Sequence, residues 1–338
     1  FQEVQAFALA AICDRLHEPE AAMAHAAEGN RLARDRYAAR GVARAPFRER
    51  IARCAQRFTA DWVNNGWASL TVEQDRPDPV FLVGFPRSGT TLLNAVLDAH
   101  PSVHAADETQ ALNAAAKTLG SGEAGYPDAL EQIDSETATY LREIYFAEMD
   151  QHLATKLGRV PRDVDQTVLI DKLPLNLVDM GLVKRLFPKA HVLFMQRHPF
   201  DAVISAYMND FAPNGAMANF LALDDAAKFY DEVMGLWEQY RRVLGLPETV
   251  VAYEDLVETF DREVERILND LGLAWNDAVR DHAQNVLARG RIATPSYQDV
   301  TQPVHTRARY RWPRYRAHLE PVWTTLAPWA RTYGYEAD

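Results

Sequence analysis

Short apolar runs alternate with longer amphipathic stretches along most of the chain. Nearly continuous apolar runs of this length are typical of strands buried on both faces. Strands that alternate with crossover helices specify a parallel sheet covered on both sides, so we predict a three-layer α/β/α fold. The expected strands are residues 80–85, a short strand that ends near 107, 167–170, 191–196 and 249–252. Between and after them we expect helices that occupy much of 111–160, then 177–187, 199–211, 224–244, 260–271 and 276–289.

The first 70 residues have a different pattern, with Ala-rich helical periodicity and no strand signal. Pro19 is well placed to open the second helix of a pair within residues 1–40, and a third helix is expected at 43–65. The pair resembles one tetratricopeptide hairpin that could recruit a protein partner, and a plain hairpin packed on the main domain is an equal alternative. The first helix is expected to pack through Val4, Phe7, Ala8, Ala11 and Ile12.

The polar stretch at 71–78 ends at Pro79, so we expect a helical segment at 1–70 and the main domain at 79–338. The chain of 338 residues carries a net charge of −11, which argues against nucleic acid as a general partner. No apolar run approaches a membrane span. Cys13 and Cys54 lie outside any metal-ligand spacing, which fits a reducing, cytoplasmic location. Because Phe1 is not an initiator Met, we expect a longer natural protein, and an upstream targeting or anchor segment stays open.

A glycine-bearing loop follows the first strand and precedes a helix. Residues 84–91 read GFPRSGTT, with the G-x4-G spacing of a P-loop-like phosphate cradle. Thr90 stands where nucleotide triphosphatases have Lys, and the cation sits earlier, at Arg87. ATP or GTP is therefore disfavoured, and a single 5′-phosphate fits. The simpler interpretation is a tight glycine turn.

Four more polar or charged side chains are expected at the same edge of the sheet. Glu108, Lys172 and Arg197 follow strands, and carboxyl ends of parallel strands gather where ligands bind in α/β proteins. Ser205 lies in the helix after Arg197, and together they suit a second phosphate. Each residue alone has an ordinary structural explanation, but two phosphate subsites indicate a nucleotide phosphorylated at two ribose positions.

Several motifs resemble one family. FLVGFPRSGTTLL is similar to the 5′-phosphosulfate loop, and VLFMQRHPFDAVISAY to the 3′-phosphate motif, of sulfotransferases that use 3′-phosphoadenosine 5′-phosphosulfate (PAPS). The run PRSGTTLLNAVLDAHPSVHAADET resembles the tyrosylprotein sulfotransferases and the bacterial tetratricopeptide-linked sulfotransferases. The similarity continues through LIDKLPLN, VVAYEDLV and SYQDVTQPVHTRARYRWPRYRAHL, and covers about residues 79–335.

The resemblance implies a donor site and a transfer site without a metal ion, with adenosine 3′,5′-bisphosphate (PAP) as product. It implies Glu108 as base, Lys172 as the cation at the transferring group and Ser296 beside the sulfate. Asn209 departs from the tyrosylprotein pattern, which has another Arg there. The donor-binding residues that the resemblance implies are Arg87, Ser88, Gly89, Thr90, Thr91, Arg197, Ser205, Tyr253 and Arg311.

The sequence does not decide which hydroxyl group accepts the sulfuryl group. A hydroxyl of protein tyrosine is one expectation, and a small-molecule, glycan or lipid hydroxyl is the alternative. The five arginines within 305–318 could line a groove for an acidic tyrosine peptide with Tyr310, Trp312 and Tyr315, or form ordinary salt bridges. His100 and His104 are alternative bases. A P-loop kinase and an inactive binding module are less favoured, and the oligomeric state, a dimer included, stays open.

Overall fold

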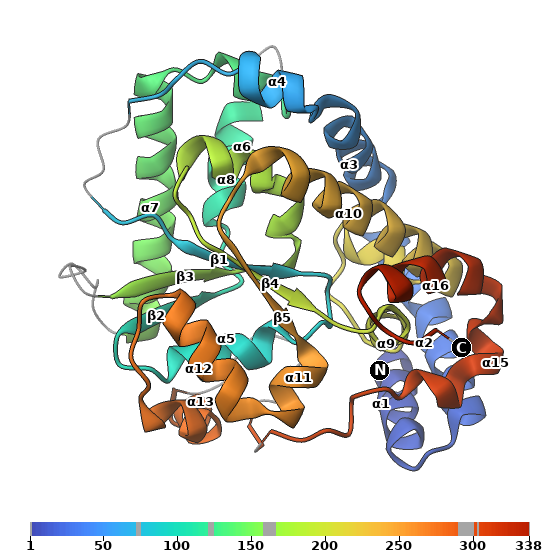
Figure 1. Cartoon of the computed structure of the whole chain (residues 1–338). Helices are drawn as coiled ribbons and strands as arrows, with labels where there is room; N and C mark the ends of the chain where they lie inside the picture. Colours follow the sequence, from blue (N-terminus) through green and yellow to red (C-terminus); the bar gives the residue numbers. More distant parts are fainter. Residues whose placement is uncertain are drawn as a thin grey trace.

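The computed structural model describes residues 2–71, 76–120, 125–157, 167–289, 301–302 and 304–337. Five parallel strands form one sheet in the order β2-β3-β1-β4-β5. This arrangement confirms the predicted parallel sheet, and Figure 1 shows it at the centre of the molecule. The strands are β1 (Val80–Gly84), β2 (Val103–Asp107), β3 (Val168–Lys172), β4 (Val192–Gln196) and β5 (Glu248–Ala252).

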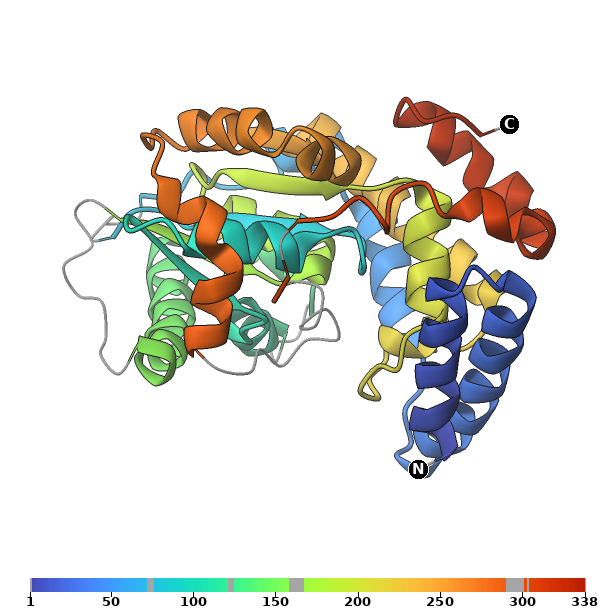
Figure 2. The same cartoon turned by 90° about the horizontal axis from the view of Figure 1, so that it is seen from below.

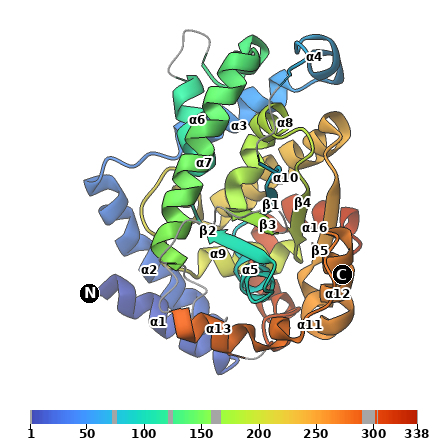
Figure 3. The same cartoon turned by 90° about the vertical axis from the view of Figure 1, so that its left-hand side faces the viewer.

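Alternate side chains of β1 enter two separate cores, one on each face of the sheet. Phe81 and Val83 pack into the larger core with α7, α8, α9, α10 and α16, whereas Val80 and Leu82 pack into the smaller one with α5, α11 and α12. Figure 3 shows α7 and α12 on opposite sides of the strands. The helices named are α5 (Thr90–Asp98), α7 (Ser135–Leu157), α8 (Met180–Leu186), α9 (Pro199–Tyr207), α10 (Leu223–Leu244), α11 (Tyr253–Glu258), α12 (Phe260–Asp270) and α16 (Trp323–Thr332).

The remaining helices lie at the periphery and at the two ends of the chain. They are α1 (Gln2–Arg15), α2 (Pro19–Ala39), α3 (Ala45–Arg57), α4 (Ala60–Asn65), α6 (Ala111–Gly120), α13 (His282–Arg289) and α15 (Arg316–Leu319). Short 3-10 helices are η1 (Asp128–Gln132), η2 (Pro174–Asp179), η3 (Met217–Phe220), η4 (Asp277–Asp281), η5 (Trp312–Tyr315) and η6 (Glu320–Val322). Among all the residues that the structure describes, no helix is long and apolar enough to cross a membrane.

The first two helices form the expected hairpin, and α2 begins at Pro19 as predicted. The prediction for the buried face of α1 was wrong except at Phe7. The structure buries Ala6, Phe7, Ala10 and Cys13, and leaves Val4, Ala8, Ala11 and Ile12 exposed. Apolar residues of α1 lie on all sides of the helix, so the sequence periodicity could not indicate which face packs against α2.

The hairpin packs on the main domain beside the loop that follows α9. Asn30 Nδ2 donates to the carbonyl of Tyr207 at 2.8 Å, and Arg36 Nη2 donates to Asp210 Oδ1 at 2.6 Å and to the carbonyl of Phe211 at 2.9 Å. Figure 2 shows the hairpin next to α9 and the helices near the C-terminus. This packing makes the hairpin part of the same folded body as the sheet.

Several helix predictions need correction at their boundaries. The helices expected at 177–187 and 276–289 begin at Met180 and His282, each after a 3-10 helix. The expected helix at 43–65 is two helices, because the Thr59 hydroxyl caps α4 by accepting from the Trp62 amide at 3.1 Å. The expected helix at 199–211 ends at Tyr207. Its last predicted residues instead enter a loop in which the Phe211 carbonyl accepts from Arg36 of the hairpin, while Asn30 donates to the carbonyl of Tyr207 at the end of α9. Part of the boundary is therefore set by tertiary contacts.

A close approach between helices at Gly181 generates a stability prediction. A Cβ on Gly181 would overlap the buried ring of Phe58, whereas Gly235 of α10 faces open space. We expect Gly181→Ala to lower the free energy of unfolding by about 1–3 kcal/mol through overpacking. The matched Gly235→Ala should raise it by up to about 1 kcal/mol through helix propensity. Urea unfolding measures both, and equal effects would contradict the close packing.

Candidate active site

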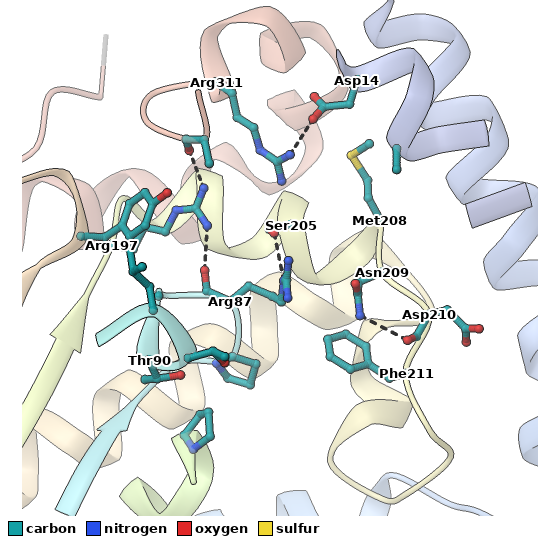
Figure 4. Close-up of a pocket in the computed structure, with 18 of the residues that line it drawn as sticks. Asp14, Arg87, Thr90, Arg197, Ser205, Met208, Asn209, Asp210, Phe211 and Arg311 are labelled. Carbon is teal, nitrogen blue, oxygen red and sulfur yellow. Dashed lines mark hydrogen bonds and ion pairs between the residues drawn. The ribbon is translucent and has the colours of Figure 1, made fainter. Parts of the chain in front are cut away.

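A cavity of about 960 Å³ opens at the carboxyl edge of the sheet. This volume is at the upper end of the usual range for ligand sites, so it has room for a nucleotide and part of a second substrate. Figure 4 shows residues from both ends of the chain around it. The predicted site residues that line it are Arg87, Gly89, Thr90, Thr91, Glu108, Arg197, Ser205, Tyr253 and Arg311.

The loop between β1 and α5 has the close-packed backbone that its glycines predict. A Cβ on Gly84 would lie 2.5 Å from the carbonyl oxygen of Met195, and one on Gly89 would lie 2.6 Å from the Tyr253 ring. Gly89 has φ +106° and Arg87 has φ 71°, both in the left-handed region. Ser88 Oγ is buried without a hydrogen-bond partner in the described structure. The loop therefore places Gly89, Thr90 and Thr91 along the cavity at the start of α5, where an anion cradle is expected.

Arg197 and Ser205 lie next to this loop. Arg197 Nη1 donates to the carbonyl of Arg87 at 2.7 Å, Nη2 donates to the carbonyl of Ala308 at 2.5 Å, and the guanidinium lies 4.7 Å from the Tyr253 ring centre. Arg87 Nε donates to Ser205 Oγ at 3.3 Å. The two predicted phosphate subsites are thus adjacent parts of one cationic wall.

Glu108 lies at the end of β2 with φ 53°, and its side chain is 38% exposed toward the cavity. Lys172 is fully buried behind it and donates to Glu108 Oε1 at 3.1 Å, while also forming an ion pair with Asp107. Lys172 therefore reaches the cavity through Glu108. Neither His100 nor His104 is among the residues that line the cavity, and His100 Nε2 instead lies 3.0 Å from the carbonyl of Ala274.

The arginine-rich stretch is held largely by partners within the protein. Arg311 Nη1 donates to Asp14 Oδ2 at 2.8 Å, Arg309 forms an ion pair with Glu258, and Arg316 lies over the Trp323 ring. Of the aromatic residues expected to line a peptide groove, Trp312 and Tyr315 are buried, so they cannot stack on a substrate. The groove prediction is wrong for these two residues, and the salt-bridge alternative describes Arg309 and Arg311.

Part of the cavity wall was not predicted from the sequence. It consists of the end of α1, the start of η2 and the loop after α9, and its residues include Asp14, Arg15, His17, Leu173, Pro174, Leu175, Met208, Asn209, Asp210 and Phe211. Asn209, the predicted departure, lies in this wall. Ser296 lies outside the described residues, so its place beside the sulfate stays a prediction. No group of three or more His, Cys, Asp or Glu in the described ranges is arranged to hold a metal ion.

A parallel α/β sheet with a glycine-bearing loop, two arginines and a carboxylate at one edge is an arrangement suited to an anionic ligand. The chain belongs to the Sulfotransferase family, whose sequence model matches residues 79–277, more than half of its length. This assignment agrees with the predicted resemblance and covers β1 through β5.

The chain is also similar to individual proteins. An uncharacterized protein of Aquifex aeolicus is 26% identical over 253 residues, which are 72% of this chain and 31% of that protein. Protein-tyrosine sulfotransferase 2 of Gallus gallus is 25% identical over 270 residues, 76% of this chain and 71% of that enzyme. The sulfotransferase domain of the Synechococcus PCC 7002 olefin synthase aligns with TM-score 0.47 and 20% identity over 73% of this chain and 91% of that one. The chain thus spans about a third of the Aquifex protein.

A buried carboxyl group behind the site generates a pH prediction. Burial raises the pKa of Asp171 to about 7, although Tyr145 OH donates to it at 2.9 Å. The folded protein then keeps this proton up to about pH 7 while the unfolded chain loses it near pH 4, so this group makes stability fall as pH rises between those values. Asp171→Asn lacks this titration. The unfolding free energy of the variant minus that of the unsubstituted protein should therefore rise by about 2–3 kcal/mol between pH 5 and pH 8. A difference that is the same at both pH values would contradict the raised pKa.

Proposed function

We propose that this protein transfers a sulfuryl group from PAPS to the hydroxyl of a tyrosine side chain. The observation that carries the proposal is the single cavity that joins the glycine-bearing anion loop, the Arg197 and Ser205 pair, and Glu108. Family membership supports the reaction class, and the name of the Gallus gallus relative supports the acceptor.

The donor fits the cationic half of the cavity. Arg87, Gly89, Thr90 and Thr91 of the loop line the cavity, and Ser88 Oγ beneath them is a buried hydroxyl without a partner among the described groups. We assign the 5′-phosphosulfate to this loop, from Arg87 to Thr91. We assign the 3′-phosphate to Arg197, Ser205 and Arg311, with Tyr253 beside the nucleotide.

The reaction needs a base on one side of the sulfur and cations on the other. The bond from sulfur to the bridging phosphate oxygen breaks, a new bond from sulfur to the acceptor oxygen forms, and the hydroxyl proton passes to Glu108. The product PAP carries away the electron pair of the broken bond. Arg87 stabilises the negative charge that builds on the departing phosphate. Lys172 acts through Glu108, since its Nζ holds one oxygen of that carboxylate.

Apolar residues Leu173, Pro174 and Leu175 line the cavity directly after Lys172, whose carbonyl accepts from the Glu108 amide, and Phe211 is a further apolar lining residue. An apolar wall beside a carboxylate base suits a phenol ring whose hydroxyl faces the base. A small phenol is a second candidate, because Arg309 and Arg311 are paired with Glu258 and Asp14. Those partners leave fewer cations for an acidic peptide.

We further propose residues 1–70 as a helical segment and 79–338 as the sulfotransferase domain. The hairpin resembles a tetratricopeptide pair, and its use by a protein partner is part of this proposal. A cytoplasmic location is supported by two free, buried cysteines at positions 13 and 54.

The acceptor is tested by sulfuryl transfer from PAPS to an acidic tyrosine peptide, a basic tyrosine peptide and a simple phenol, detected by the mass gain of one sulfuryl group. We expect the acidic peptide to have the highest kcat/KM, and this value to fall as salt screens the remaining cavity arginines. Transfer to the phenol alone would replace the tyrosine acceptor with a small molecule. No transfer from PAPS to any hydroxyl would reject the proposed function.

The base is tested by Glu108→Gln, which keeps the shape and the contact with Lys172 and removes the basicity. We expect turnover to fall by about 10²-fold or more, while PAP still binds. Glu136→Gln is the matched control, because Glu136 is an exposed carboxylate in the first turn of α7. Near-normal turnover of Glu108→Gln would remove the base role from this residue.

A further inference from the structure

A contact between the two ends of the chain forms one part of the cavity wall. Asp14 in the last turn of α1 and Arg311 just before η5 both line the cavity, and their side chains form an ion pair at 2.8 Å. Figure 4 shows the Arg311 guanidinium on the side of Ser205 and Arg197, with Asp14 bonded to it. Asp14 lies outside the 79–277 match, so family membership assigns it no role.

Asp14 is held by several donors of the C-terminal stretch. Besides Arg311, Tyr315 OH donates to Asp14 Oδ1 at 2.5 Å, and Arg314 reaches the same oxygen at 3.5 Å and the Asp14 carbonyl at 3.3 Å. Burial opposes ionisation of this carboxyl, but Arg311, Tyr315 and Arg314 lower the pKa of Asp14 below its ordinary value. The carboxylate is therefore charged and fixed in position at neutral pH.

This position is unfavourable for α1 by itself. A carboxylate in the last turn faces the negative end of the helix macrodipole, and the Asp14 side chain is only 17% exposed. The contacts with the C-terminal stretch offset both costs. Asp14 thus contributes to the placement of that stretch and not to the stability of an isolated α1.

Arg311 has a second carboxylate within its electrostatic reach. Asp201 in the first turn of α9 also attracts it, and Asp201 Oδ2 is buried without a hydrogen-bond partner in the described ranges. Without Asp14, Asp201 is the carboxylate that still attracts Arg311. With Asp14, the guanidinium is paired in the cavity wall that also contains Arg197 and Ser205.

We propose that Asp14 is a positioning residue of the donor site, which holds Arg311 where it meets the 3′-phosphate of the nucleotide. The inference rests on the proposed function, because that proposal identifies the nucleotide bound in the cavity. It makes the N-terminal hairpin a part of the donor site. Donor affinity then depends on how α1 is seated.

The test compares two nucleotides by titration calorimetry with the full chain. We expect Asp14→Asn to weaken the binding of adenosine 3′,5′-bisphosphate by about 5- to 20-fold, which lies within the range for coupled contacting groups, and to change the binding of adenosine 5′-phosphate less than twofold. Asp35→Asn is the matched control, because Asp35 is exposed on α2 of the same hairpin, and it should change neither affinity. In the double variant, Arg311→Ala should make the Asp14→Asn loss disappear.

Three outcomes would overturn the inference. They are equal losses for both nucleotides, no loss for either, and additive losses in the double variant. If Asp14→Asn does not fold, Tyr315→Phe replaces it, since this change removes one donor to Asp14 and keeps the carboxylate. It should give a smaller loss that is again confined to the bisphosphate. If the unsubstituted protein binds neither nucleotide, the proposed function itself fails. If the unsubstituted protein and Asp14→Asn bind the bisphosphate equally well, only the role of Asp14 fails.

Discussion

The parallel pairing of β1 between β3 and β4 is the constraint on which the site depends. Gly84 lies opposite Met195 in this register, and the space between them admits no side chain on residue 84. The loop after β1 therefore leaves the sheet directly beside the end of β4. The same edge receives Glu108 from β2, because Asp107 pairs with Lys172 across β2 and β3. The strand register thus brings the loop with Arg87, the carboxylate of Glu108 and the guanidinium of Arg197 to one cavity.

Burial on both faces explains why the sequence predicted this sheet well. Residues 80–83 are apolar at every position, and each face of β1 enters its own core. Such a run has few alternative placements, so strand positions and their polar ends were predictable. Arg87, Glu108 and Arg197 followed from the rule that parallel strands end at a common edge. Their chemical roles depend on the resemblance and on the proposed function.

Other features could not be predicted because they depend on contacts between distant segments. The buried face of α1 is chosen by packing against α2, since apolar residues surround the helix. The end of α9 is chosen in part by Asn30, which bonds to the Tyr207 carbonyl from another element. Nothing near Asp14 in the sequence indicates a partner 297 residues away at Arg311. Local sequence contains no information about such distant pairs. A buried strand, by contrast, is visible as a short run of apolar residues.

The pairing of positions 14 and 311 also has a consequence for biosynthesis. A ribosome adds about 5–20 residues per second, so about 15–60 s separate the synthesis of these two residues. During that time α1 has no C-terminal stretch to contact, and its exposed Val4, Leu9 and Ile12 add to the apolar surface of the nascent chain. The sheet and its anion loop can form earlier. Completion of the cavity is therefore a late event relative to the synthesis of α1, and a nascent chain that has not yet released residue 311 lacks this wall.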